Sequence, residues 1–176
     1  MSAGGILSIA EVNALPLEQF DWLFGNVVEH CPEAARAVVS KRPFVNKEAL
    51  KKSFDDYLEN LDDTGKESVL LKHPDLAGKL AEVGKLTQES SNEQKSAGLD
   101  ALTKEEKQTL NNYNYLYKEK FQFPFVICAR RNKVATIFEG IENRLKNSRT
   151  EELNTGINEV KKICRIRIDD LVWSNA

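Results

Sequence analysis

Apolar residues recur along most of this chain at spacings of three and four, which is the pattern of helices that bury one face. The first stripe follows Pro16, a residue suited to an early helical position, and comprises Leu17, Phe20, Phe24, Val27 and Val28. A short helix is expected over residues 33–40. A longer one should start after the N-cap Asn46 and bury Leu50, Phe54, Leu58 and Leu61.

The middle of the chain alternates helical residues with residues that stop a helix. Residues 62–65 should break the helix, and residues 66–72 then lead into His73. Pro74 follows at once, so a helix must stop or turn at the histidine. Residues 79–86 are ambiguous and are expected to be partly looped.

The next two helices carry N-terminal signals. Thr87 should cap a helix over residues 88–97. Thr103 and Glu106 have the spacing of a capping box, which predicts that a helix over residues 104–120 begins there.

One run of the chain has an extended rather than a helical composition. Pro124 interrupts residues 121–130, and the apolar residues that follow it are typical of strands. No second run offers a partner strand, so we interpret this run as a buried extended segment. Another helix is predicted over residues 137–145, and Thr150 should cap the last one, over residues 151–172.

The helical patterns and the short connections between them predict an all-α fold, a single compact multi-helix domain over residues 1–176. With 41% hydrophobic residues among 176, the chain can bury one well-formed core. A net charge of −2 with interspersed acids and bases argues against nucleic acid as a partner. No apolar run nears the roughly 20 residues of a membrane span, so no membrane is expected. Residues 1–8 lack the features of a signal peptide, and we interpret them as a loose lead-in.

The cysteines argue against a disulfide framework. Cys31, Cys128 and Cys164 are odd in number, far apart and flanked by apolar residues, which predicts reduced, mostly buried thiols in an intracellular protein. The sequence has neither closely spaced Cys or His pairs nor a Gly-rich phosphate loop, so we expect no metal site and no nucleotide.

His73 is the first candidate for chemistry. It is one of two histidines, and a side chain that titrates near neutral pH at a helix end is suited to proton transfer. A histidine in such a place is, by itself, more often structural than catalytic. The other, His30, is interpreted as a surface or helix-end residue.

Arg167 falls on the apolar stripe of the last helix, whereas Arg165 falls on its polar side. An arginine that faces the interior needs an anion or several acceptors, because an unpaired buried charge is costly. Three interpretations stay open: a buried ion pair, a side chain that extends outward, and a clamp that grips a carboxylate through two hydrogen bonds.

Two further features admit both a structural and a functional interpretation. Ser90, Glu93 and Gln94 share one face of the helix over residues 88–97, as either a solvated or capping face or a binding face. The backbone groups of residues 123–129 need partners, as either a crossing segment or the wall of a pocket that binds a ligand with many carbonyls.

Several motifs resemble those of a known family when they are taken in order. They are Phe24-Gly25-Asn26-Val27, Arg42-Pro43-Phe44, His73-Pro74-Asp75-Leu76-Ala77-Gly78, Leu86-Thr87 with Glu89-Ser90 and Glu93-Gln94, Phe123 to Arg130, and Glu159 to Ile163 with Arg167. Together they resemble the 2-oxo-4-hydroxy-4-carboxy-5-ureidoimidazoline (OHCU) decarboxylases over almost the whole chain. The family commonly has Gly where this chain has Gln122, which puts the turn before Phe123 in question.

The resemblance implies an all-helical homodimeric carboxy-lyase of urate degradation that forms (S)-allantoin and carbon dioxide from a ureidoimidazoline without metal or organic cofactor. It implies that His73, Glu93 and Arg167 are catalytic. It assigns substrate binding to Pro74, Ser90, Ser91, Asn92, Glu93, Gln94, Phe125, Val126, Ile127, Cys128, Ala129 and Arg167.

The chemistry of these groups suits a decarboxylation. We expect His73 to act as acid and base, Glu93 to accept hydrogen bonds from substrate N–H groups, and Arg167 to hold an oxyanion or the departing carboxylate. Backbone amides of residues 125–129 would bind carbonyl oxygens. The thiol of Cys128 is interpreted as buried and inert rather than nucleophilic.

Two alternatives compete with this function. One is a non-catalytic helical binding module on the same fold, and the other is a decarboxylase or lyase acting on a related ureido acid. The location is expected to be cytoplasmic or peroxisomal, and the cytoplasm is favoured because residues 173–176 show no Ser-Lys-Leu type signal.

Overall fold

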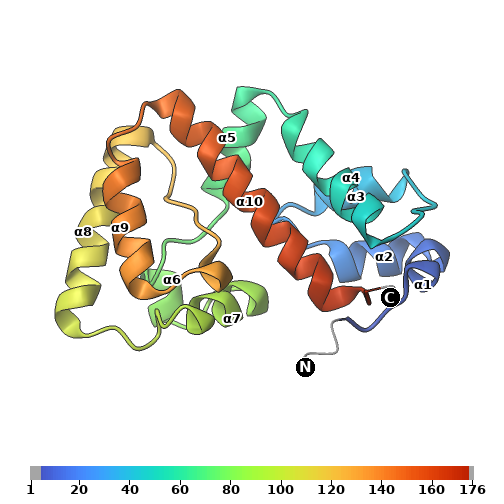
Figure 1. The fold of residues 1–176 in the computed structure, drawn as a ribbon, viewed down its shortest axis with the longest axis horizontal. Coiled ribbons are helices and arrows are strands. Elements are labelled where there is room, and N and C mark those ends of the chain that lie inside the picture. The colour runs from blue at the N-terminus through green and yellow to red at the C-terminus, as the bar shows by residue number, and fades with distance from the viewer. Residues whose placement is uncertain (1–4, 175–176) are drawn as a thin grey trace. The chain divides into compact units, whose positions relative to one another are not determined.

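The fold is helical, which confirms the predicted all-α class (Figure 1). The structure is a computed structural model that describes residues 5–174. Its helices are α1 (Ile9–Ala14), α2 (Leu17–Phe24), α3 (Pro32–Val39), α4 (Lys47–Glu59), α5 (Asp63–Leu71), α6 (Lys79–Glu82), α7 (Gln88–Ser96), α8 (Lys104–Phe121), the 3-10 helix η1 (Ala129–Arg131), α9 (Val134–Arg144) and α10 (Arg149–Leu171).

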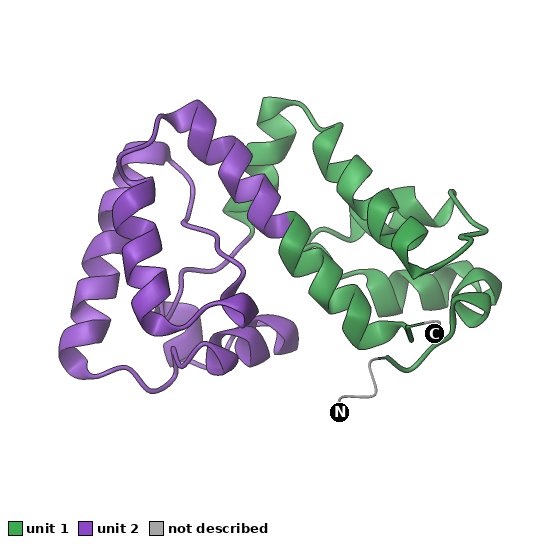
Figure 2. Ribbon diagram, viewed as in Figure 1, with its two compact units in different colours: residues 1–72, 161–176 green, residues 73–160 purple. Residues whose placement is uncertain are grey.

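The chain divides into two compact units, which Figure 2 shows in different colours. Unit 1 comprises residues 1–72 and 161–176, and unit 2 comprises residues 73–160. Helix α10 begins in unit 2 and ends in unit 1. The assignment of residues 1–176 to one domain stays a prediction.

Most residues of the predicted apolar stripes form the core of unit 1, but Leu17 is exposed and Leu61, beyond the end of its helix, is only half-buried. Helix α3 packs against α2 and α4. Leu50, Phe54 and Leu58 of α4 are fully buried, and the Asn46 side chain caps this helix by accepting from the Ala49 amide at 2.8 Å. The stripe after Pro16 is only partly helical, because α2 ends at Phe24 and the buried residues Val27 and Val28 lie beyond it.

The interpretation of residues 1–8 as a loose lead-in is wrong for residues 5–8, while residues 1–4 lie outside the described part of the chain. The amides of Ile6 and Leu7 both donate to the Leu171 carbonyl at 3.0 Å, and the Trp173 amide donates to the Leu7 carbonyl at 2.8 Å. Ser8 then opens α1 through a capping box with Glu11, which the apolar pattern did not indicate.

Three helix starts differ from those predicted: α9 begins at Val134 rather than at residue 137, and the starts of α5 and α10 also differ. Helix α5 begins at Asp63 rather than at residue 66, because the Asp62 side chain caps it by accepting from the Gly65 amide at 2.7 Å. In the last helix the Ser148 hydroxyl, not Thr150, accepts from the Glu151 amide at 3.2 Å, so α10 starts earlier. In both places a side chain slightly upstream satisfies the N-terminal amides.

In unit 2 the Thr103–Glu106 capping box is confirmed, and the ambiguous residues 79–86 contain only the short α6. Helix α8 ends at Phe121, and Gln122 follows in the left-handed region with φ 64°. The rings of Tyr117, Phe121, Phe123 and Phe125 then pack together, with centroid separations of 4.5–6.1 Å. This aromatic cluster anchors the start of the extended segment.

Candidate active site

His73 lies where the sequence places it, directly after a helix. Helix α5 ends at Leu71 with Lys72 as its C-cap, and His73 is the first residue of unit 2. Its side chain is buried, with 9% of its surface exposed. Pro74 follows, so the histidine begins a loop that runs to Gly78.

The three residues after Pro74 are held from two helices. From α7, the Gln94 Oε1 accepts from the Ala77 amide at 2.9 Å. From α8, the Asn114 Nδ2 donates to the Leu76 carbonyl at 3.1 Å, and the Lys118 Nζ donates to the Asp75 carboxylate at 2.6 Å. Residues 75–77, which we call the tethered loop, are therefore fixed within unit 2.

Helix α7 buries the polar face that the sequence singles out. Ser90, Glu93 and Gln94 are all buried, which overturns the interpretation of this face as a solvated surface. Ser91 is half-buried. Asn92 is exposed and its Oδ1 accepts from the Gln88 Nε2 at 2.9 Å, so it lies on the outer side of the helix.

The extended segment of residues 125–129 is buried apart from the half-exposed Ile127, and side chains bind its backbone groups. The Arg144 NH1 donates to the Val126 carbonyl at 2.8 Å. The Cys128 amide donates to the Glu159 Oε1 at 3.2 Å, and the Asn132 Nδ2 donates to the Cys128 carbonyl at 2.9 Å. These bonds supply the partners expected of a crossing segment.

The charges that act on the Cys128 thiol indicate that this segment lies close to α7. Burial first, and then the Glu159 carboxylate, raise the pKa of the Cys128 thiol, and the Glu93 carboxylate acts in the same direction. Helix α7 also packs against η1, which follows the segment. Unit 2 therefore gathers the tethered loop, the buried face of α7 and the extended segment around one helix.

Arg167 lies in unit 1, and the prediction that it faces the interior is confirmed, since 4% of its surface is exposed. Its NH1 donates to the Asn26 carbonyl at 2.8 Å and pairs with the buried Glu29 carboxylate at 3.3 Å. The ion-pair interpretation is thus confirmed, while the role as an anion clamp stays a prediction. Arg165 lies on the polar side as expected, and it pairs with Asp55 at 2.7 Å.

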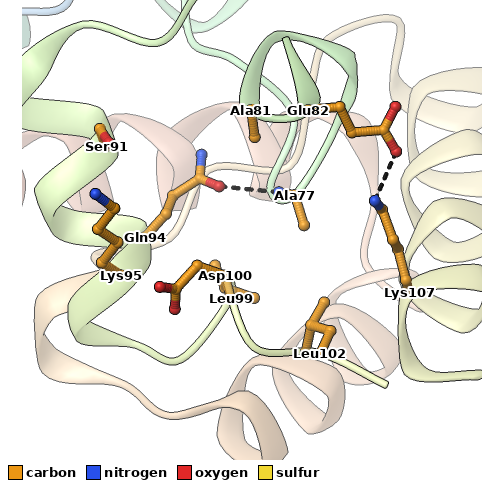
Figure 3. Close-up of a pocket in the computed structure, with 10 residues that line it drawn as sticks. All are labelled: Ala77, Ala81, Glu82, Ser91, Gln94, Lys95, Leu99, Asp100, Leu102 and Lys107. Atoms are coloured by element: carbon orange, nitrogen blue, oxygen red, sulfur yellow. Dashed lines mark hydrogen bonds and ion pairs between the residues drawn. The ribbon is translucent and has the colours of Figure 1, made fainter. Parts of the chain in front are cut away.

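A cavity of about 270 Å³ lies beside α7 (Figure 3). Two of the predicted binding residues, Ser91 and Gln94, are among those that line it, together with apolar side chains such as Leu99. Glu82 and Lys107 at its edge form an ion pair at 2.7 Å. The Gln94–Ala77 bond lies beside this cavity, so the tethered loop forms part of its lining.

Several residues of this region were not predicted as functional. Asn114 is a buried polar residue on the otherwise apolar face of α8, a pattern that could have drawn attention to it. Glu159 belongs to one of the resembling motifs, but its contact with Cys128 follows only from the fold. Arg144 is three helical turns into α9, and no sequence pattern connects it to Val126.

The described residues contain no group of three or more His, Cys, Asp or Glu side chains that could hold a metal ion. All three cysteines are buried and free, as predicted. In the described part of the chain, no helix is long and apolar enough to span a membrane.

Comparisons with known proteins agree with the resemblance in the motifs. Residues 13–169 match the family described as OHCU decarboxylase. The 2-oxo-4-hydroxy-4-carboxy-5-ureidoimidazoline decarboxylase of Xenopus laevis is 46% identical over 165 residues, which cover 94% of each chain.

Two solved structures share the fold. The crystal structure of (S)-allantoin synthase has a TM-score of 0.73 at 19% identity, and the alignment covers 92% of this chain but 53% of that one, about half its length. The crystal structure of OHCU decarboxylase in the presence of (S)-allantoin has a TM-score of 0.66 at 24% identity, covering 82% of this chain and 93% of that one.

Proposed function

This chain belongs to the OHCU decarboxylase family, and from that premise we propose that it converts OHCU to (S)-allantoin and carbon dioxide in urate degradation. The observation that carries the proposal is the 46% identity to the Xenopus laevis decarboxylase over 94% of both chains.

The reaction breaks one carbon–carbon bond. Carbon dioxide leaves the ring carbon that carries the hydroxyl group, and the bonding electron pair is delocalised into the adjacent C=N group, whose nitrogen takes up a proton to give an enol. The hydroxyl proton is then lost as the carbonyl forms, and the neighbouring ring carbon, which carries the ureido group, takes up a proton. A single enantiomer results only if the proton arrives on one face. The protein must therefore hold the ring in one orientation beside a proton donor.

His73 is proposed as the acid and base, and Glu93 as the carboxylate that orients the ring. Both side chains are buried in unit 2. Burial supports these roles, because hydrogen bonds and charges act more strongly where water is excluded. The imidazole would exchange a proton with the substrate hydroxyl, while Glu93 accepts hydrogen bonds from substrate N–H groups.

Within the extended segment, the backbone of Ile127 is the best candidate to bind substrate carbonyl and N–H groups. The Val126 carbonyl and the Cys128 amide already have side-chain partners. Among the described residues, no hydrogen-bond partner is found for the N–H and C=O of Ile127. The alternation of an extended chain supports this assignment, since successive residues present their groups to opposite sides.

Arg167 is proposed as the group that binds the substrate carboxylate, on the strength of its motif. Its NH1 is fixed by Asn26 and Glu29, which keeps the guanidinium in one orientation. Exchange for lysine would remove the planar, two-pronged donor while keeping the charge.

The experiment is to generate OHCU from urate with urate oxidase and hydroxyisourate hydrolase, and to follow the circular dichroism of (S)-allantoin. The protein should make the signal appear faster than spontaneous decay does, and His73→Asn should reduce the rate by at least a hundredfold. His30→Asn is the matched control, because His30 is the other histidine and is exposed.

Unchanged spontaneous decay in the presence of wild-type protein would instead support the non-catalytic binding module. Near-normal turnover by His73→Asn would refute the role of His73. Faster turnover of a neighbouring ureido acid than of OHCU would support the related lyase.

The remaining parts of the proposal rest on the resemblance. We propose a homodimer, which light scattering of the purified protein would test. We propose a reaction without metal or organic cofactor, so dialysis against EDTA should leave turnover unchanged. A cytoplasmic or peroxisomal location is proposed, and imaging of the tagged chain in cells would distinguish the two.

A further inference from the structure

We propose that Asn114, with Lys118 and Gln94, positions the His73 imidazole by fixing the tethered loop. Through their bonds to this loop, these side chains contribute to turnover indirectly rather than by binding the substrate. The inference rests on the proposed function of His73 and assigns a role to residues of α8 that the motifs leave out.

Each of the three side chains binds a different group of the tethered loop, and the three groups belong to consecutive residues. Lys118 binds the carboxylate of Asp75 at 2.6 Å. Asn114 binds the carbonyl of Leu76 at 3.1 Å, and Gln94 binds the amide of Ala77 at 2.9 Å. A side chain, a carbonyl and an amide held from two helices leave the loop little freedom to move relative to them.

The loop needs such support because its backbone is unfavourable. Ala77 has φ 50°, in the left-handed region that side chains with a Cβ rarely adopt. A residue in that region persists only where its surroundings enforce the conformation. The Gln94 bond to the Ala77 amide acts at this very residue.

Asn114 is the part of this network that packing alone does not explain. It is 5% exposed and occupies the same face of α8 as the fully buried Leu110, Tyr117 and Phe121. An apolar side chain would suit that face, whereas a buried carboxamide is stable only with hydrogen-bond partners. Its bond to the Leu76 carbonyl gives it a partner and gives the loop an anchor.

The loop is short and stiff enough to transmit displacement to His73. Pro74, whose ring fixes φ, is the only residue between His73 and Asp75. A movement of Leu76 by about 1 Å would therefore move the imidazole, and misplacement on that scale can cost about a hundredfold in rate. Asn114 is thus a positioning residue.

The test compares Asn114→Asp with Asn112→Asp. The first keeps the shape of the side chain but replaces the donor with an acceptor that repels the Leu76 carbonyl. The second makes the same change at an exposed position of the same helix. We expect kcat of Asn114→Asp to fall at least tenfold with KM within twofold, and Asn112→Asp to behave as wild type.

A spectroscopic readout separates positioning from general damage. The chain has two histidines, so NMR of the imidazole protons yields one signal set from His73 and one from His30, which serves as an internal reference. In Asn114→Asp the His73 signals should shift while those of His30 stay unchanged.

Lys118 supplies a second test should Asn114→Asp fail to fold. The Lys118–Asp75 pair is partly exposed, with 46% and 30% of the two side chains accessible, so its loss should hardly change stability. Lys118→Met should lower kcat about threefold or more with an unchanged melting temperature, and Lys118→Arg should restore it.

Wild-type kcat and unshifted His73 signals in folded Asn114→Asp, or in Lys118→Met, would overturn the inference. Equal losses in Asn114→Asp and Asn112→Asp would overturn it too. If wild-type protein fails to accelerate the reaction, the proposed function fails, yet the His73 signals still decide whether Asn114 positions the imidazole.

Discussion

Replacing Arg144 with methionine should destabilise the protein strongly, because this arginine joins three groups in the interior of unit 2. Its Nε pairs with Glu152 at 2.7 Å, and the two side chains are 11% and 0% exposed. Its NH1 donates to the Val126 carbonyl, and its guanidinium lies 4.3 Å from the centroid of the Phe125 ring. Methionine keeps the packing of the stem and removes the charge and the donors.

The expected loss in free energy of unfolding is about 3 kcal/mol. Removal of one partner from a buried ion pair costs roughly 3–5 kcal/mol, since the other charge stays buried without compensation. Glu152 keeps hydrogen bonds from the Tyr117 hydroxyl at 2.6 Å and the Asn147 Nδ2 at 2.9 Å, which favours the lower end of that range. A loss of this size corresponds to a fall in melting temperature of about 6–12 °C.

Urea unfolding followed by far-UV circular dichroism measures this loss. The double variant Arg144→Met/Glu152→Leu should lose less than the sum of the two single variants, because it leaves no uncompensated charge. Lys146→Met, an exposed change nearby, is the control. A loss below about 1 kcal/mol for Arg144→Met, or strict additivity in the double variant, would refute the reasoning.

Three further predictions concern single positions. Gln122→Gly should raise the free energy of unfolding by about 0.5–1 kcal/mol in the same assay, since glycine adopts φ 64° without strain; a destabilised variant would contradict this. Cys128→Ala should keep turnover within about twofold, because burial and the Glu159 carboxylate raise the pKa of the thiol and keep it protonated at neutral pH; loss of turnover with an intact fold would disprove it. Burial acts to raise the pKa of Asp169, but hydrogen bonds from Lys47 and Lys51 outweigh it and lower the pKa. The ionised Asp169 carboxylate therefore stabilises the fold above the unfolded-state pKa of about 3.9, and this stabilisation is lost as pH falls through the lower folded value. Asp169→Asn should have a lower free energy of unfolding than wild type at pH 7 in the same assay, and the difference should disappear in acid.

Local sequence signals predicted most helices because their causes are local. The Thr103–Glu106 capping box and the stripe through Leu50, Phe54 and Leu58 depend on residues within one or two turns, and both are found as expected. The predicted helix start was wrong where a second residue able to cap the helix lay nearby, as at Ser148. The predicted burial of Arg167 held because a helical stripe fixes which side faces the core.

The contacts that connect distant segments could not be predicted in this way. Asn114 and Leu76 are 38 residues apart, and Cys128 and Glu159 are 31 apart, so only the packing of helices brings each pair together. The ordered segment before α1 was missed for the same reason, since Leu7 is bound by Leu171 and Trp173 from the far end of the chain.

The division of the chain between its two units has a consequence for biosynthesis. Unit 2 is one continuous stretch, residues 73–160, whereas unit 1 joins residues 1–72 to residues 161–176. At about 5–20 residues per second, a ribosome needs roughly 4–18 s to synthesise the 88 residues from 73 to 160. During that time Arg167, which pairs with Glu29, and Leu171 and Trp173, which bind Leu7, have not yet been synthesised. The first unit to be started is therefore the last to be completed, and nascent chains stalled within unit 2 expose the unfinished core of α2 to α4.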